Sequence, residues 1–218
     1  MSMRRDMGAH GNGITHGSQY QGVVNSSIDR WHGEGEYRLA MAIYALGDAV
    51  PTIHPTAFVH PEAVIIGSVT IGAESTIWPG AVLRGDDGQI VVGERTSIQD
   101  NTVIHTTPHT PTIVGNDCVI GHIVHLECCT IDDSAQVSSG AVGLHRVHVG
   151  SGAIVAANAV VLNDTIVPPG ALAVGTPAVI KEGRARSEEI QLGSAVYVKK
   201  GRYFSTAMRR LPDHPNGQ

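Results

Sequence analysis

The feature that most constrains this chain is an aliphatic residue that recurs every six positions over most of its length. The series comprises Ile53, Val59, Ile65, Ile71, Ile77 and Leu83, then Val92, Ile98 and Ile104, then Val114, Ile120 and Leu126, and finally Ile131, Val137, Gly143, Val149, Val155, Val161, Val167 and Ala173. A surface helix would instead repeat apolar residues at spacings of three and four. A strict period of six is typical of a parallel β-helix with three short strands per coil and does not suit an ordinary β-sandwich. We therefore predict an all-β fold, a parallel β-helix of hexapeptide repeats.

The residues that flank the aliphatic positions follow the same repeat. Small residues often stand two positions earlier, as at Ala63 and Ala81, and glycine often follows, as at Gly72 and Gly93. We expect the aliphatic side chains to fill the interior of the prism and the glycines to permit its corners. The abundant Val and Ile suit the short strands between those corners.

Counting along the repeat places the polar residues relative to one another. Arg84, His105 and Glu127 each directly follow an inward aliphatic residue on successive coils, so they should stack on one face about 4.8 Å apart. His122 follows a different hexapeptide and should lie one coil above Asp100, on another face. One prism does not easily bring two faces onto one ion, whereas two copies packed side by side can. The spacing therefore favours an oligomer with its site between subunits.

Three interruptions of the period surround these residues. Three residues are added within 83–92, four are added within 104–114, and one is lost within 126–131. Loops on a rigid scaffold are common places for function. We therefore expect a functional site beside these breaks.

Composition excludes several classes of protein. The net charge of −5 is spread over both signs, which does not suit a nucleic-acid surface. The sequence contains no run of 18 apolar residues for a membrane span and no signal-peptide pattern, so we expect a cytoplasmic protein. Cys118, Cys128 and Cys129 form no CxxC motif and are expected to be buried, unpaired thiols.

The chain divides into four segments by composition. Residues 1–36 are rich in Gly, His, Ser and Asn and are interpreted as a flexible extension. Residues 37–180 form the β-helix, 181–211 a C-terminal helix packed on it, and 212–218 a tail. Ser187 is the expected N-cap of the helix. The helix should run to about residue 210 and pack on the prism through Ile190, Val196, Val198, Tyr203 and Met208.

Four motifs together resemble the γ-class carbonic anhydrases and their relatives, some of which are called ferripyochelin-binding proteins. They are WPGAVLRGD (78–86), IQDNTVIHTT (98–107), IGHIVHLECCTI (120–131) and PPGALAVGTPAVI (168–180). The likeness covers about residues 41–211 and keeps the order of the motifs. It implies a left-handed β-helix and a homotrimer with a metal ion at each interface. In that family, two histidines of one subunit and one of its neighbour hold each ion.

The resemblance assigns His105 as the first metal ligand and His122 as the ligand from the neighbouring subunit. Glu127 stands where the family has its third histidine, although a carboxylate can complete a zinc site. Zinc-bound water ionises near neutral pH, and the resulting hydroxide attacks CO2 to give bicarbonate. The charge of Glu127 should slow that step and makes Fe²⁺ or another divalent ion a stronger alternative to Zn²⁺. His125 is the alternative third ligand, and it or His109 would be the proton shuttle.

Three further residues match the family's site. Arg84 and Asp86 match an Arg-Gly-Asp pair that joins subunits, and from the residues alone an interface ion pair with two parallel bonds is favoured over direct catalysis. Gln99 matches a glutamine that orients the metal-bound water. Hydrogen bonding at a turn or an interface explains Gln99 and Asp100 as well as catalysis does.

We therefore expect a trimeric carbonic-anhydrase-like lyase that acts on CO2 or bicarbonate, with low activity because of Glu127. Three other functions stay open: a metal-dependent hydrolase or lyase for another small metabolite, a non-catalytic trimeric scaffold or binding protein, and a hexapeptide acyltransferase. The last would need a groove for CoA, which no motif indicates. His145 and His148 are expected to be surface histidines rather than ligands of a second ion.

Overall fold

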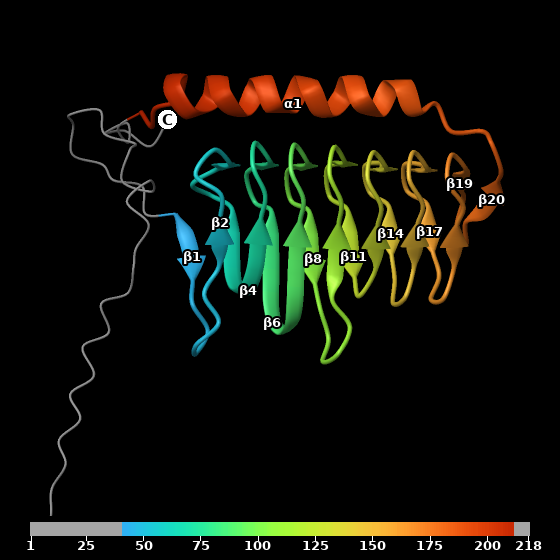
Figure 1. The fold of residues 1–218 in the computed structure, drawn as a ribbon, viewed down its shortest axis with the longest axis horizontal. Coiled ribbons are helices and arrows are strands. Elements are labelled where there is room, and N and C mark those ends of the chain that lie inside the picture. Colours follow the sequence, from blue (N-terminus) through green and yellow to red (C-terminus); the bar gives the residue numbers. More distant parts are fainter. Residues whose placement is uncertain (1–40, 212–218) are drawn as a thin grey trace, which may run out of the picture. The chain divides into compact units, whose positions relative to one another are not determined.

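The computed structural model describes residues 41–211, which form a β-solenoid with one long helix packed against it (Figure 1). The predicted extension at 1–36 and the predicted tail at 212–218 lie outside these residues. Within residues 41–211, no helix combines the length and the apolar character that crossing a membrane requires.

The solenoid makes about seven coils, and its three faces are columns of stacked strands. The first face consists of β1 (Ala42–Tyr44), the first parts of β4 (Val64–Ile71) and β6 (Val82–Val92), β8 (Val103–His105), β11 (His125–Glu127), β14 (Val142–Gly143) and β17 (Val160–Val161). The second face consists of β2 (Thr52–Ile53), the later parts of β4 and β6, β9 (Thr112–Val114), β12 (Thr130–Ile131), β15 (His148–Val149) and β18 (Ile166–Val167). The third face consists of β3 (Phe58–Val59), β5 (Thr76–Ile77), β7 (Ser97–Ile98), β10 (Val119–Ile120), β13 (Gln136–Val137), β16 (Ile154–Val155), β19 (Leu172–Val174) and β20 (Val179–Lys181).

The strand register confirms the columns that the six-residue count predicted. Leu83 pairs with Ile104, and Ile104 pairs with Leu126, in parallel strands of successive coils. The aliphatic residues of all three faces meet in one continuous buried core. Burial of a side chain of this size contributes about 1.5–3 kcal/mol, so the repeated aliphatic position is what holds the coils together. The predicted parallel β-helix with a C-terminal helix is therefore confirmed.

The three breaks of the period all fall at one corner of the prism, between the first and the second face. We call this the loop corner and define it as residues 84–89, 106–111 and 127–130. The inserted residues of the middle loop turn back at Thr107 and Thr110, which form an isolated bridge, and place His109 at an exposed tip. The insertions thus leave the core in register while they gather polar residues of three coils at one edge.

The glycines that follow the aliphatic positions have another role than the predicted one. Gly72, Gly93 and Gly115 are not among the residues with positive φ. A Cβ atom on Gly93 would lie 2.6 Å from the carbonyl carbon of Gly115 on the next coil, so the close stacking of backbones excludes any side chain. The left-handed turn conformation falls two positions later, at Glu74 (φ 58°) and Arg95 (φ 53°). The expectation that these glycines permit the corner by their conformational freedom is therefore wrong.

Helix α1 (Ser187–Ala207) runs back along the stack from the β20 end and packs on β3, β5, β7 and β10 of the third face (Figure 1). The predicted N-cap is wrong by one residue: Arg186 holds that position, and no side chain caps the helix. Ser187 instead lies against Gly152, where an added Cβ would be 3.4 Å from the Ser187 Cβ. The helix ends before residue 210 because Met208 adopts an extended backbone.

The face that α1 turns to the solenoid matches the predicted one only in part. Ile190 is fully buried as expected, but Val196 and Tyr203 are 40% and 67% exposed. The contact face runs through Ile190, Ser194, Tyr197, Gly201 and Phe204. Trp78 of the solenoid packs edge-on against two aromatic rings of this face, with centroids 5.1 and 5.6 Å away. These aromatic contacts and the close approach at Gly201 set the rotation of the helix.

Candidate functional site

Polar side chains of successive coils meet at the loop corner. The register sets Arg84 beside His105 and His105 beside Glu127, as the count predicted. The Arg84 guanidinium donates to one oxygen of Asp86, and the other oxygen of Asp86 lies 3.0 Å from His105 Nε2. His105 Nδ1 lies 3.1 Å from Glu127 Oε1. Within one chain, both ring nitrogens of His105 therefore face carboxylates.

Glu127 is the centre of this cluster, because three imidazoles surround its carboxylate. Its Oε1 faces His105, while its Oε2 lies 3.4 Å from His125 Nε2 and 3.6 Å from His145 Nε2. His125 and Glu127 project from the same side of β11, as their spacing of two residues requires. The structure therefore brings both candidates for the third metal ligand, Glu127 and His125, to one place.

Both acidic residues of the cluster are held in the ionised form. Burial alone would raise the pKa of Glu127, but hydrogen bonds from His105 and His125, with electrostatic attraction to His145, hold that pKa below its usual value. Burial would likewise raise the pKa of Asp86. A bond from its own backbone amide, the His105 bond and the Arg84 charge outweigh this and lower it. The loop corner therefore presents two carboxylates at neutral pH.

His145 is a member of the cluster that the sequence reasoning missed. We predicted a surface histidine there, whereas its side chain is two-thirds buried and contacts Glu127. Gly143 pairs with Leu126, so the count sets His145 one coil beyond Cys128 and does not indicate its contact with Glu127. His148 behaves differently: its Nε2 lies 2.9 Å from Asp132 on the second face.

His122 lies at a second corner, between the third and the first face, which we call the histidine corner (residues 99–102 and 121–124). Its Nδ1 is 2.8 Å from Asp100 Oδ2, one coil below, as the count predicted. The His122 side chain is 49% exposed. Carboxylates commonly orient a metal-ligating imidazole through its other nitrogen. Asp100 is placed to do this for His122 Nε2.

Gln99 also lies at the histidine corner, but it faces the helix. Its side chain is only 5% exposed and hydrogen bonds to Tyr197 of α1. Burial raises the pKa of Tyr197, and the bond with Gln99 partly offsets that rise. The structure thus gives Gln99 a role in docking the helix, and its role in orienting a water molecule stays a prediction.

A single chain brings together only part of the predicted metal site. Among residues 41–211, no three His, Cys, Asp or Glu side chains are arranged to hold an ion. His105 and Glu127 meet at the loop corner, while His122 lies at the histidine corner on another face. The predicted set of His105, His122 and Glu127 would therefore close only if a second copy supplied His122.

The three cysteines are buried free thiols, as predicted. Burial raises the pKa of Cys118 and of Cys129 to about 12. A raised pKa keeps a thiol protonated, so at pH 8 each residue should hold about a thousandfold less thiolate than an ordinary cysteine. We expect site-resolved alkylation at pH 8 to be slower by at least that factor in the folded protein than in urea, because burial also blocks access of the reagent. Equal labelling of Cys118 in both states would contradict the burial seen here.

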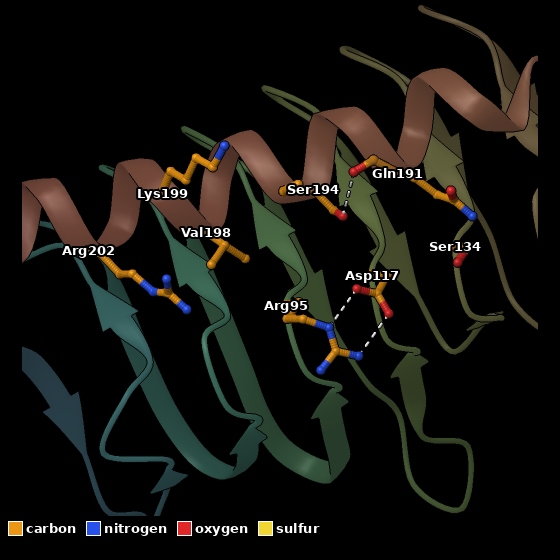
Figure 2. A pocket seen from close by; sticks show the side chains of 9 residues that line it. Arg95, Asp117, Ser134, Gln191, Ser194, Val198, Lys199 and Arg202 are labelled. Atoms are coloured by element: carbon orange, nitrogen blue, oxygen red, sulfur yellow. Dashed lines mark hydrogen bonds and ion pairs between the residues drawn. The ribbon is translucent and has the colours of Figure 1, made fainter.

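A groove of about 460 Å³ separates α1 from the corner between the second and third faces (Figure 2). Arg95 lies in it and donates two bonds to Asp117, at 2.7 and 2.9 Å. Arg202 of the helix pairs with Glu74. The arginines of the groove thus have carboxylate partners, and none of the predicted site residues lines it.

Comparison with known proteins places the repeat in a family of transferases. Residues 51–85 match the family model described as Bacterial transferase hexapeptide (six repeats). The carnitine operon protein CaiE of Escherichia coli K12 is 42% identical over 114 residues, which are 52% of this chain and 58% of that protein. The CaiE protein of Escherichia coli O157:H7 is 45% identical over 102 residues, 47% of this chain and 52% of that protein. The chain thus spans about half the length of the curated relatives it matches.

Two solved structures match over nearly their whole length. One is a Bacillus cereus protein provisionally named an acetyltransferase, with 31% identity and a TM-score of 0.75, covering 78% of this chain and 99% of that one. The other is a hexapeptide transferase family protein from Anaplasma phagocytophilum, with 34% identity and a TM-score of 0.72, covering 75% and 98%.

Proposed function

We propose that this chain, which belongs to the hexapeptide-repeat transferase family, is a homotrimeric, metal-dependent hydratase of the γ-carbonic-anhydrase type. Its substrate is CO2 or bicarbonate, and its sites lie between subunits. The observation that supports this most is the pairing of His105 with Glu127 on adjacent coils, 3.1 Å apart. Together with His122 of a second copy, they would form a donor set of two imidazoles and one carboxylate.

The donor chemistry of these residues fits a divalent ion. Two histidines with one glutamate are an established ligand set for catalytic zinc, and they also accept iron. The His105 and Glu127 side chains are 17% and 22% exposed at the edge of the prism, where another copy can reach them. A bound zinc ion would act as a Lewis acid and would lower the pKa of its bound water to near neutral pH.

The remaining polar residues would hold the two histidines in place. Asp100 binds His122 Nδ1, which fixes the orientation of that ring. Asp86 binds His105 Nε2 and is itself held by Arg84. Each candidate histidine thus has a carboxylate outside the proposed ligand set on one nitrogen, and the other nitrogen of His105 faces Glu127. We propose Arg84 and Asp86 as positioning residues rather than as groups that touch the substrate.

Glu127 should limit the rate of this reaction. A carboxylate adds negative charge next to the ion and weakens its action as a Lewis acid. The His125 and His145 side chains beside Glu127 offset part of that charge. We therefore expect slower CO2 hydration near neutral pH than a site of three histidines would give.

Metal analysis tests this proposal directly. Protein purified without added metal should sediment as a trimer and carry about one ion per chain, as cyclic symmetry requires. His105→Ala should remove that ion. His109→Ala is the matched control, since it deletes an exposed histidine at the tip of the same corner. Absence of metal after zinc or iron is supplied would rule out the proposed function.

A second variant separates the identity of the site from its activity. Glu127→His restores a third imidazole, so we expect it to keep the ion and raise the hydration rate about tenfold. The measurement is stopped-flow CO2 hydration at equal metal content. A metal-loaded variant without any gain would show that Glu127 does not limit the rate. A metal-loaded wild type that is inert towards CO2 would favour a hydrolase or lyase reaction on another small metabolite.

Acyl transfer from CoA is a second candidate, because two similar structures carry transferase names. It predicts retention on immobilised CoA and transfer from acetyl-CoA to a small amine or alcohol. His105→Ala should abolish that transfer at unchanged CoA retention if His105 is the base. Failure of the wild type to bind CoA would exclude this candidate.

A further inference from the structure

One turn of the histidine corner carries a residue that does not suit its backbone conformation. The equivalent turn residue has φ between 53° and 72° at Gly80, Asn101, Ile123, Gly140 and Asn158. Glycine and asparagine tolerate this left-handed region, whereas a β-branched side chain crowds the backbone there. Within residues 41–211, Ile123 is the one β-branched residue with positive φ.

The contacts of Ile123 within its own chain do not explain this choice of residue. Its side chain is 61% exposed, so isoleucine gains little burial there. Its N–H donates to the Asp100 carbonyl at 2.9 Å, a bond that asparagine or glycine would form equally well. The folding of one chain therefore favours Asn or Gly at position 123. An exposed, strained residue of this kind is a reason to look for a function.

The position of Ile123 beside His122 indicates what covers it. Both side chains project from one turn, and the His122 carboxylate partner sits on the coil below. If His122 ligates an ion held by a second copy, its ring nitrogen must come within about 2.0–2.1 Å of that ion. The surface of the second copy would then pass close to the neighbouring Ile123 side chain.

We propose that Ile123 is an apolar contact with a second copy of this chain and anchors the turn that presents His122. This inference rests on the proposed function. The first face, which begins just after this turn, carries an outward column of partly exposed side chains that a second copy can also cover. These are Val64, Val82, Val103, His125, Val142 and Val160, so His125 interrupts the valines. Removal of the isoleucine from water on assembly offsets the backbone strain.

The test compares Ile123→Asn with Ile166→Asn. Ile166 is a matched control because it is 67% exposed and lies in β18 of the second face, in ordinary strand conformation. Sedimentation over a range of protein concentrations measures assembly, and urea unfolding of the dissociated chain measures its own stability. We expect Ile123→Asn to raise the dissociation constant at least about tenfold and to raise the urea midpoint of the dissociated chain. Ile166→Asn should leave assembly unchanged.

The conservative variant Ile123→Val checks that the effects of Ile123→Asn come from loss of the apolar β-branched side chain. It keeps the β-branch and most of the apolar surface, so both assembly and the urea midpoint should stay close to wild type. Unchanged assembly of Ile123→Asn, or equal weakening by Ile166→Asn, would overturn the proposed contact.

Metal content reports on the proposed function separately. A metal-loaded wild-type assembly that tolerates Ile123→Asn would refute the contact alone. A wild-type assembly without metal that Ile123→Asn weakens would support the contact and refute the hydratase.

Discussion

Refolding His105→Ala chains together with His122→Ala chains should restore metal binding. Each variant alone should lose metal affinity by more than about tenfold. Binding should return in the mixture because the proposed site takes residues from two chains. Where a His122→Ala chain supplies His105 and Glu127, and a His105→Ala neighbour supplies His122, every ligand is present. Random assembly of equal amounts leaves about a quarter of the interfaces intact in a cyclic trimer. Zinc per chain after dialysis measures the recovered fraction.

The matched control for this mixture is His105→Ala refolded with Glu127→Ala. These two residues meet in a single chain at the loop corner, so a site takes both from the same subunit. Neither type of chain in the control mixture can supply an intact pair, and no metal should return. Recovery in the control, or none in the test mixture, would contradict the assignment of His122 to the neighbouring subunit.

The parts of the structure that follow from counting could be predicted from the sequence. A period of six with three strands per coil leaves a single register for Leu83, Ile104 and Leu126, and the pairs found are those. The same arithmetic set His105 beside Glu127. It works because every coil repeats one backbone geometry, so that position in the sequence determines position in space.

The parts that depend on side-chain reach and packing could not be predicted in this way. His145 lies one coil beyond Cys128 in register, yet its ring extends sideways to Glu127. The hydrogen bond between Gln99 and Tyr197 joins residues about a hundred positions apart, which counting along the repeat does not connect. The rotation of helix α1 depends on aromatic rings around Trp78 as well as on the buried Ile190.

The steric role of the glycines also could not be predicted by counting, and it leads to a large expected loss of stability. Gly93→Ala should lower the free energy of unfolding by about 3 kcal/mol, at the upper end of the range for overpacked cores. A Cβ at this position would approach the backbone of Gly115 to 2.6 Å and the Asn116 side-chain oxygen to 2.7 Å. Backbone atoms of a stacked coil cannot rotate away as a side chain can, so the coils would have to separate. Urea denaturation of the two proteins measures the difference.

The same substitution in α1 should have the opposite sign. A Cβ on Gly193 would meet its nearest neighbour, Val119 Cγ2, at the ordinary distance of 3.4 Å. Alanine in a helix interior is more stable than glycine by about 0.5–1 kcal/mol, so Gly193→Ala should raise the urea midpoint. Both variants remove the conformational freedom of a glycine, but only Gly93→Ala places a Cβ against the backbone of a stacked coil. Comparing the two therefore separates the steric effect from the entropic one. If Gly93→Ala matched wild type, the coils would be spaced more widely at that corner than the structure shows, and the glycine would have no steric reason to follow the aliphatic position.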